Sequence, residues 1–419
     1  VLPAKKFLSS VRDKSLRIPG SVFICTIDGH YPEDIDDVVW DKDPDKILIA
    51  DADTICVAPG FKSPTAFVIA DAYNNDGTEV SIAPRSILKK VLALYAAKGW
   101  KPIIAPEVEF YLVSQNVDPD FPLQPPAGRS GRPETARQSY SIDAVNEFDP
   151  ILDLMYDYAE EMELDVDTLI HESGAAQLEV NFVHSDPMSR ADQVFLFKRT
   201  MREAALRHGI YATFLAKPME NEPGSAMHIH QSMLDAKTGK NLFAGKKENQ
   251  HSELFKNYLG GLQKYVPMAM PFFAPNVNSY RRLAVGEVAP INVQWGFDNR
   301  TCGLRVPMDS LENTRVESRF AGSDANPYLA MAATLACGYL GIIEKLKPTE
   351  PLTTSAQDKG YELPRSLEES LKWLRGCEPL QNLMGERFVN AYIHVKEKEY
   401  QTYFRVISSW EREFLLLNV

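Results

Sequence analysis

The sequence predicts an α+β fold: a small β-rich module, then a large domain of antiparallel strands with helices on one side. Three observations support this prediction. Short apolar runs rich in β-branched residues alternate with turn residues up to about residue 80. Strand-like and helix-like segments then mix, and helical patterns dominate after residue 325. We therefore expect an N-terminal domain at 1–80 and a second domain at 81–419.

The elements follow from local signals along the chain. The predicted strands of the N-terminal module are SVFICTI, KILIA, TICVA and TAFVIA. The helix APRSILKKVLALYAAKGW begins with Pro in its first turn and stops at Gly99. The larger domain has predicted strands IIAPEVEFYLV, AAQLEVNFV and AMHIHQSM, and predicted helices LDLMYDYAEEMEL and ADQVFLFKRTMREAALRHG. Segment 121–138, rich in Pro, Gly and Arg, is expected to be a mobile excursion.

Composition and charge exclude several classes of protein. The 44% hydrophobic and 24% charged residues are typical of a globular chain. A net charge of −12 argues against a nucleic-acid partner, and we found no apolar run long enough to predict a membrane span. Five scattered cysteines without a CxxC motif favour a reducing, cytoplasmic location. Because the first residue is Val, we expect the natural chain to begin earlier.

Polar residues two positions apart occur in three strand-like segments: Glu107-x-Glu109, His228-x-His230 and Glu317-x-Arg319. Residues i and i+2 of a strand project from the same face, so each pair presents two groups together. Such pairs also occur on solvated strand faces, which makes each one weak evidence alone. Here the acids lie among apolar β-forming residues, where a buried carboxylate needs a cation or a donor.

The segment HESGAAQLEV adds Glu172 and Glu179 to this set. Five glutamates with one or two histidines form an oxygen-rich donor set, which suits Mg²⁺ or Mn²⁺ better than Zn²⁺. Two divalent ions that share carboxylates indicate phosphoryl chemistry on a nucleotide. Five arginines follow within 282–319, and guanidinium groups bind carboxylates and phosphates bidentately, although most arginines form only surface salt bridges. The sequence contains no GxxxxGK[ST], GxGxxG or GxSxG motif.

Over nearly its whole length the chain resembles the glutamine synthetase family, class I type. The resemblance rests on PEVEF, HESGAAQLE, KPMENEPGSAMHIHQS, NSYRRLAVGEVAP, NRTCGLRVP and RVESRFAGSDANPYLA, in this order. It implies an N-terminal β-grasp domain, a catalytic domain with a curved antiparallel sheet, and active sites between subunits of a hexamer or dodecamer. It also implies two-step chemistry, in which ATP phosphorylates the γ-carboxylate of glutamate and an amine then displaces the phosphate.

The resemblance assigns a role to each matching residue. Glu109, Glu172 and Glu179 match the ligands of one metal ion, and Glu107, His228 and Glu317 match those of a second ion that holds the ATP phosphates. Residues expected along the nucleotide and its phosphates are His230, Ser232, Arg300, Arg305 and Arg315. Gly224, Arg282 and Arg319 are expected to hold the substrate glutamate.

The chain departs from the family pattern in the flap, which in glutamine synthetases reads roughly RLxPGxEAP. Here RLAVGEVAP places Val288 at the position of the catalytic Glu, and Glu287 one residue earlier. A slip of one residue in an extended loop turns a side chain to the opposite face, so Glu287 is expected to replace that carboxylate only if a flexible flap re-aims it. With Arg300 and Asp28, Glu287 stays a candidate catalytic residue. Loss of the acceptor weakens a site for ammonium and leaves apolar room for the carbon chain of a larger amine.

Two further departures concern the nucleophile and the glutamate loop. The family block DGSS reads DGHY here, so Asp28 can still supply a carboxylate to the neighbouring subunit while Tyr31 adds bulk. Pro223 stands in NEPGSAMH where the family has Asn. We therefore expect a ligase that joins a polyamine or a bulky, apolar monoamine to glutamate. The alternatives are an ordinary ammonia-using glutamine synthetase and a catalytically silent structural or regulatory homologue.

Overall fold

The computed structural model describes residues 1–32, 43–135, 138–247, 250–284, 286 and 288–419. The N-terminal part contains α1 (Ala4–Arg12), β1 (Arg17–Ile18), β2 (Lys46–Ala50), β3 (Cys56–Val57), β4 (Ala66–Phe67) and β5 (Ala70–Tyr73). Strands β1, β2 and β5 form one antiparallel sheet, and β3 pairs with β4. The predicted strand KILIA is confirmed as β2.

The prediction of a strand at SVFICTI is wrong, because Gly20–Ile24 forms a 3₁₀ helix. The backbone N–H and the hydroxyl of Ser21 both donate to the carboxylate of Asp43, at 2.7 and 2.6 Å. The Ser21 N–H is thereby used by a distant carboxylate and is no longer free for the ladder of a sheet. The helix α1 that precedes this segment was not predicted at all.

The larger part of the chain contains one long mixed sheet. Its strands are β6 (Trp100–Ser114), β7 (Val166–His171), β8 (Gln177–Phe182), β9 (Ile210–Thr213), β10 (Met227–Asp235), β11 (Trp295–Phe297), β12 (Leu304–Val306) and β13 (Val316–Ser318). The order is β11-β12-β13-β10-β6-β8-β7, with β9 paired to β6, and among the strands that the structure describes only the β11–β12 pair is parallel. The predicted strands around PEVEF, QLEV and HIH are therefore confirmed, and they lie side by side.

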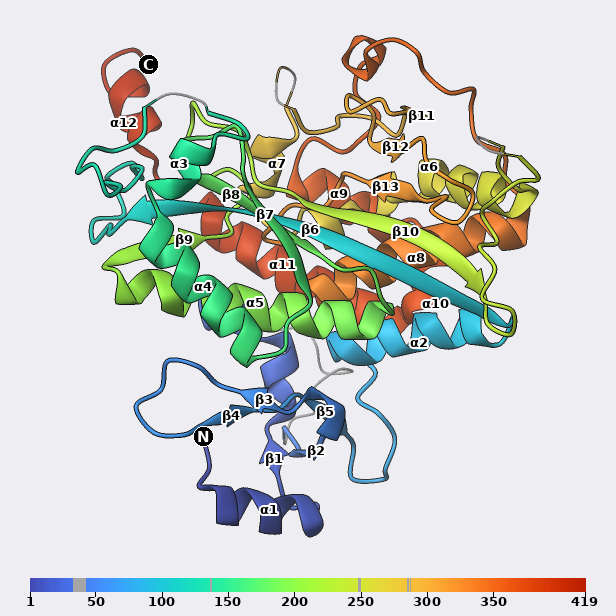
Figure 1. The fold of residues 1–419 in the computed structure, drawn as a ribbon, viewed down its shortest axis with the longest axis horizontal. Coiled ribbons are helices and arrows are strands. Elements are labelled where there is room, and N and C mark those ends of the chain that lie inside the picture. Colours follow the sequence, from blue (N-terminus) through green and yellow to red (C-terminus); the bar gives the residue numbers. More distant parts are fainter. Residues whose placement is uncertain (33–42, 136–137, 248–249, 285, 287) are drawn as a thin grey trace.

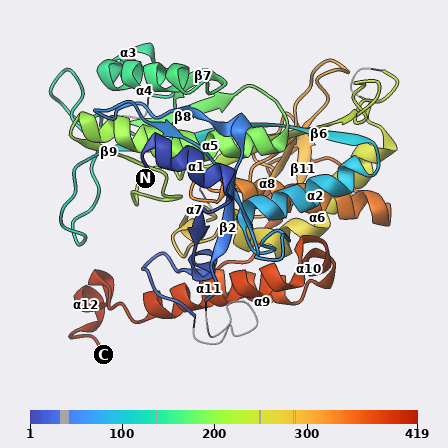
Figure 2. The same cartoon turned by 90° about the horizontal axis from the view of Figure 1, so that it is seen from below.

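Helices cover one side of this sheet and the N-terminal strands lie beyond them (Figure 1). The helices of the larger part are α2 (Pro84–Ala96), α3 (Ile142–Asn146), α4 (Asp149–Glu161), α5 (Pro187–Arg207), α6 (Glu253–Phe273), α7 (Ser279–Arg282), α8 (Pro327–Glu344), α9 (Leu367–Arg375), α10 (Glu378–Met384), α11 (Glu386–Phe404) and α12 (Ser409–Leu415). Of these, α7 and α12 lie above the sheet in Figure 1, away from the helical layer. In the view from below, α1 and β2 of the N-terminal part lie in front of α5 and α2 (Figure 2).

The alternation along β6 determines which side of the sheet carries the polar residues. Phe110 packs against Phe197 of α5, with ring centroids 6.1 Å apart, so the even positions of β6 face the helices. Successive strand residues point to opposite faces, and Glu107 and Glu109 therefore project from the face that the helices leave open. The core packing of one face thus determines the position of the polar site on the other.

Helix α8 is the one helix in the described part of the chain that is long and apolar enough to cross a membrane, a run that the sequence analysis overlooked. The share of this helix buried inside the fold is 72%. It packs against α2, α5, α6 and α10, and it is close to α6, since a Cβ on Gly341 would collide with the backbone of Gly261. This burial makes α8 a core helix.

A buried ion cluster joins the N-terminal part to the helices. Arg85 at the start of α2 lies 2.6 Å from Asp51, 2.7 Å from Asp71 and 2.9 Å from Asp192 of α5. The carboxylates of Asp51, Asp71 and Asp192 all pair with the guanidinium of Arg85, and these ion pairs offset the cost of burying its charge. The cluster holds the N-terminal strands against α2 and α5.

Candidate active site

The sheet register brings the predicted carboxylates and histidines together. His228 of β10 is paired with Glu107 of β6, and Glu109 of β6 is paired with Glu179 of β8. On the other side of β10, His230 is paired with Glu317 of β13. Cross-strand neighbours have Cβ atoms about 4.5–5.5 Å apart, which leaves their side chains within reach of one another. Four neighbouring segments therefore form one polar cluster on the open face.

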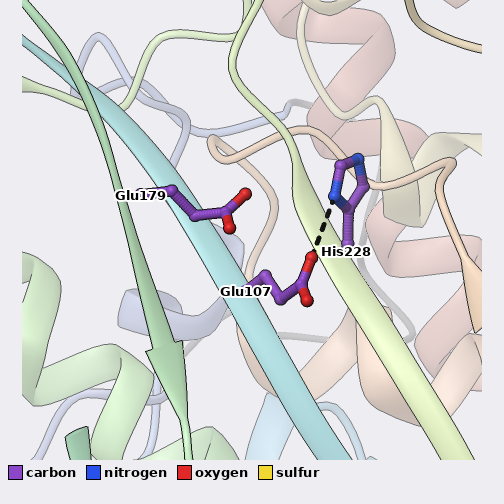
Figure 3. Close-up of side chains that lie close together, drawn as sticks. All are labelled: Glu107, Glu179 and His228. Atoms are coloured by element: carbon purple, nitrogen blue, oxygen red, sulfur yellow. Dashed lines mark hydrogen bonds and ion pairs between the residues drawn. The ribbon is translucent and has the colours of Figure 1, made fainter. Parts of the chain in front are cut away.

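Within this cluster the distances are those of potential metal ligands. His228 Nδ1 lies 3.4 Å from Glu107, 3.7 Å from Glu317 and 3.9 Å from Glu109. Glu107, Glu179 and His228 point toward one another from β6, β8 and β10 (Figure 3). Their ligand atoms lie within 4.8 Å of one another, and so do those of a second group made by Glu107, His230 and Glu317.

These groups differ from the sets that the family resemblance implies. Glu107 belongs to both groups, and His230, which we expected along the nucleotide, joins the second. In the resemblance Glu179 belongs with Glu109 and Glu172, whereas its ligand group here contains Glu107 and His228, although Glu109 is its cross-strand partner. All six predicted metal ligands lie in or beside the cluster, but the division between two ions stays a prediction.

The pKa values of the carboxyls show two different environments. Burial, followed by repulsion from Glu172, raises the pKa of Glu109, and burial with repulsion from Glu109 raises the pKa of Glu179. Burial also opposes the ionisation of Glu317, but Arg319 and the histidines outweigh it and hold its pKa at about 2. Burial lowers the pKa of His228 to about 4, which leaves a neutral imidazole that can bind a metal. A divalent cation would relieve the carboxylate repulsion, so this donor set fits one.

Two arginines bind the buried carboxylate of Glu317. Arg319 Nη1 donates to Glu317 Oε1 at 2.5 Å, and Arg305 Nη1 donates to Glu317 Oε2 at 2.9 Å. The Nε atoms of both arginines are buried without a hydrogen-bond partner. Each guanidinium therefore keeps a donor beside the cluster, as a site for phosphate or carboxylate oxygens requires.

A large cavity of about 590 Å³ opens next to the cluster. Glu107, His230, Ser232 and Arg315 all line it, so three of the five residues that we expected along the nucleotide share this cavity. Arg315 is further held by Asp309, which its Nη1 approaches to 2.8 Å. The cavity's other lining side chains include Asp167, Asn181, Phe182, His184 and Glu312. A cavity of this size suits a nucleotide.

A small cavity of about 50 Å³ lies on the other side of the cluster. It is lined by the three predicted glutamate-binding residues, Gly224, Arg282 and Arg319, together with Glu109, Glu172 and Val288. Burial lowers the pKa of Arg282 to about 10, so this guanidinium stays charged near neutral pH. Gly224 is needed for packing, since a Cβ there would collide with the side chain of Arg282.

Three of the predicted residues that the structure describes lie outside both the ligand cluster and the two cavities. Asp28 and Tyr31 are exposed on the N-terminal part, where the neighbouring Ile27 N–H donates to Glu399 of α11 at 2.9 Å. Arg300 is exposed between β11 and β12, although its charge lowers the pKa of Glu172, which burial raises overall. Glu287 lies outside the described residues.

Gln177 is a site residue that the sequence analysis missed. Its Nε2 donates to Glu109 at 3.2 Å and to the carbonyl of Gly224 at 3.1 Å, and it lines the small cavity. A signal for it existed, because Gln177 precedes Glu179 by two residues and so projects from the same face of β8. The same-face spacing therefore identifies amide side chains as well as charged residues and histidines.

The comparison with known proteins now decides the family. A family model described as the catalytic domain of glutamine synthetase matches residues 81–415, which is most of the chain. The chain belongs to the glutamine synthetase family. This result confirms the family, the fold class and the expectation of a carbon–nitrogen ligase, all drawn from the sequence.

Several members of the glutamine synthetase family are similar over nearly the whole chain. The chain is 34% identical to the γ-glutamylputrescine synthetase of Escherichia coli (strain K12), over 97% of this chain and 86% of that protein. It is 31% identical to the glutamate–isopropylamine ligase of a Pseudomonas species, over 97% and 89%. A solved structure described as apo GmaS without ligand has a TM-score of 0.84 and 27% identity, and the match covers 99% of this chain and 92% of that one.

The raised carboxyl pKa values give this glutamine synthetase-family site a pH-dependent stability without metal. Glu109 and Glu179 have folded-state pKa values above those of the unfolded chain, so the stability they contribute is lost as the pH rises. We expect the melting temperature in EDTA to fall as the pH rises from the ordinary carboxyl pKa of 4.5 toward the folded-state pKa values, about 8 for Glu109 and about 10 for Glu179, and Glu179→Gln to fall less steeply. Differential scanning fluorimetry measures both slopes, and equal slopes would contradict the assignment.

Proposed function

We propose that the protein catalyses ATP-dependent ligation of an organic amine to the γ-carboxylate of L-glutamate. The observation that carries this proposal is the place of Val288 in the small cavity, beside Glu172 and the predicted glutamate ligands. A valine there offers apolar contact to a carbon chain and no acceptor to ammonium. The names of two relatives, one with putrescine and one with isopropylamine, support a polyamine or an apolar monoamine as the second substrate.

ATP occupies the large cavity in this proposal, with its phosphates at the end lined by Glu107 and His230. Ser232 and Arg315 lie along the same wall. Arg305 and Arg319 both form ion pairs with Glu317. The Nε–H of each, which has no partner in the protein, is proposed to donate to the transferring phosphoryl group. Arg300 is the remaining cation assigned to the leaving phosphate.

Divalent ions, Mg²⁺ or Mn²⁺, are the proposed cofactors, with two or more ions in each site. The residues that would hold them are Glu107, Glu109, Glu172, Glu179, His228 and Glu317. When bound, such ions neutralise phosphate oxygens and orient the γ-phosphate for in-line attack. Without these ions, the carboxylates of the cluster would repel the negatively charged phosphates of ATP.

Arg282, Arg319 and the backbone of Gly224 bind and orient glutamate in the small cavity. A γ-carboxylate oxygen attacks the γ-phosphorus of ATP, and the bond to the β-phosphate oxygen breaks to release ADP. The amine nitrogen then attacks the acyl carbon of γ-glutamyl phosphate, the bond from that carbon to the phosphate oxygen breaks to release inorganic phosphate, and the amine passes a proton to Asp28 of a neighbouring subunit. Glu172, which lines the cavity, and Asp28 from a neighbouring subunit are the groups proposed to stabilise the cationic amine.

The proposal includes a homo-oligomer, a hexamer or a dodecamer, with each site between two subunits. Asp28 and Tyr31 are exposed on an N-terminal loop away from the cavities of their own chain, which supports a role at the site of a neighbour. We also propose the division into 1–80 and 81–419, and a cytoplasmic location. Sedimentation velocity would test the assembly, since a monomer would leave Asp28 without a site.

The test of the reaction is release of phosphate from ATP in the presence of glutamate, Mg²⁺ and a panel of amines. We expect alkyl amines or diamines to stimulate release by at least about tenfold over ammonium, because a pocket that binds one extra methylene discriminates by 10-fold or more. The panel should include putrescine, isopropylamine, an aromatic amine and ammonium. Mass spectrometry of the γ-glutamyl product identifies the bond formed.

Two outcomes would contradict the proposal. Stimulation by ammonium alone would make the protein an ordinary glutamine synthetase. No phosphate release with any amine, and no thermal stabilisation by Mg²⁺ with ATP, would favour a catalytically silent homologue, because a ligand that binds only the native state must stabilise it.

A further inference from the structure

The turn between β7 and β8 presents three consecutive backbone N–H groups to side-chain acceptors. Gly174 N–H donates to Gln177 Oε1 at 2.9 Å, and Ala175 N–H donates to Glu222 Oε2 at 3.1 Å. Ala176 N–H donates to Glu134 Oε2 at 2.7 Å, from a backbone with φ of 60°. Successive amides that point into one concavity bind anions. Here the concavity holds two carboxylates of the chain itself.

These carboxylates come from two loops that are far from the turn in sequence. Glu222 directly precedes Pro223 and Gly224 of the glutamate loop. Glu134 belongs to the Pro-rich excursion, its side chain is only 5% exposed, and it also lies 3.0 Å from Nε2 of the buried His171. The excursion, expected to be mobile, is therefore held at Glu134 by two partly buried hydrogen bonds.

The turn connects both loops to residues that face the substrates. It begins at Glu172, which lines the small cavity, and it ends at Gln177, which holds the carbonyl of Gly224. Tyr111 OH donates to the carbonyl of Pro223 at 2.8 Å. A Cβ on Gly174 would collide with the Tyr111 hydroxyl, so the turn and the loop fit only in this arrangement.

We propose that Glu222 and Glu134 are positioning residues. By accepting hydrogen bonds from the N–H groups of the β7–β8 turn, they fix the loop that carries Gly224 and the Pro-rich segment around Glu134 relative to Glu172. Neither carboxylate lines the small cavity. Glu222 acts through Gly224 and Glu134 acts through the turn that carries Glu172. The identity of the ligand in this cavity, glutamate, rests on the proposed function.

The kinetic test compares four variants of the full chain. Glu222→Ala leaves the Ala175 N–H without its acceptor, and we expect KM for glutamate to rise on the order of tenfold while KM for ATP stays within about twofold. Glu222→Gln keeps an oxygen acceptor and should restore most of the loss. Glu220→Ala is the matched control, because Glu220 is exposed two residues earlier in the same loop. Glu134→Ala should raise KM for glutamate in the same selective way.

Equal rises of both KM values, or no change in either, would overturn the proposal, and so would a Gln variant as impaired as the Ala variant. Amide hydrogen exchange provides a readout that needs no turnover. Peptides that cover 172–177 should exchange faster in Glu222→Ala and in Glu134→Ala than in the unmodified protein or in Glu220→Ala. Unchanged exchange in both variants would contradict the claim that the two carboxylates fix the N–H groups of the β7–β8 turn. If the exchange changes but no amine supports phosphate release, the proposed function fails and the positioning role stands.

Discussion

Replacing Glu107 with Gln is expected to lower turnover with ATP, glutamate and an amine by at least about 10²-fold, more than the usual cost of losing a residue that only supports a metal ligand. Glu107 is the residue that the two ligand groups share, and it lies 3.0 Å from His230 Nε2 and 3.4 Å from His228 Nδ1. Gln has nearly the same shape but one neutral oxygen in place of a carboxylate. Both ion sites should therefore weaken together.

Phosphate release and a titration with Mn²⁺ would measure this effect. The control is Glu203→Gln on the exposed side of α5, where Glu203 pairs with Arg207 at 3.2 Å and the pair contributes under about 1 kcal/mol to stability. If Glu107→Gln keeps two Mn²⁺ ions bound with wild-type affinity, the shared role of Glu107 is wrong. Loss of a single ion would favour the division that the family resemblance implies.

The spacing of residues in strands predicted which groups face the same way, and the structure confirms it for β6 and β10. Glu107 and Glu109 project together because even positions such as Phe110 face the helices. The same rule applied to amides would have found Gln177. These predictions need only the period of a strand, which is local in sequence.

The register between strands could not be predicted, because it depends on contacts between residues that are far apart in the sequence. Nothing local indicates that His228 is opposite Glu107, or that His230 is opposite Glu317. The ligand groups depend on these pairings, which explains why His230 was assigned to the nucleotide alone. A slip of one residue would turn each side chain to the other face.

Single residues in irregular loops carried no signal. Glu134 and Glu222 each bind one amide of the β7–β8 turn, yet neither belongs to a periodic pattern. The 3₁₀ helix at Gly20–Ile24 also depends on a distant partner, Asp43, and an apolar run of that length reads equally well as a strand. Hydrogen bonds between residues far apart in the sequence therefore determine the positions of Glu134 and Glu222 and the 3₁₀ helix at Gly20–Ile24.

Replacing Val288 with Glu is expected to reverse the amine preference. Val288 is 65% exposed and lines the small cavity with Glu172 and Ala289. A carboxylate there would attract the small ammonium cation and would have to lose water for a carbon chain to pack against it. We expect kcat/KM for the best alkyl amine or diamine to fall by roughly tenfold or more, and kcat/KM for ammonium to rise.

The control is Val288→Gln, which matches the size of Glu without its charge. If charge attracts ammonium, only the Glu variant gains activity with ammonium, whereas both variants lose activity with the larger amine because both remove apolar contact. The ratio of the two kcat/KM values is the quantity to measure, since a general loss of folded protein lowers both equally. An unchanged ratio in Val288→Glu would show that the flap position does not select the amine, and the choice would then rest on residues such as Tyr31 from a neighbouring subunit.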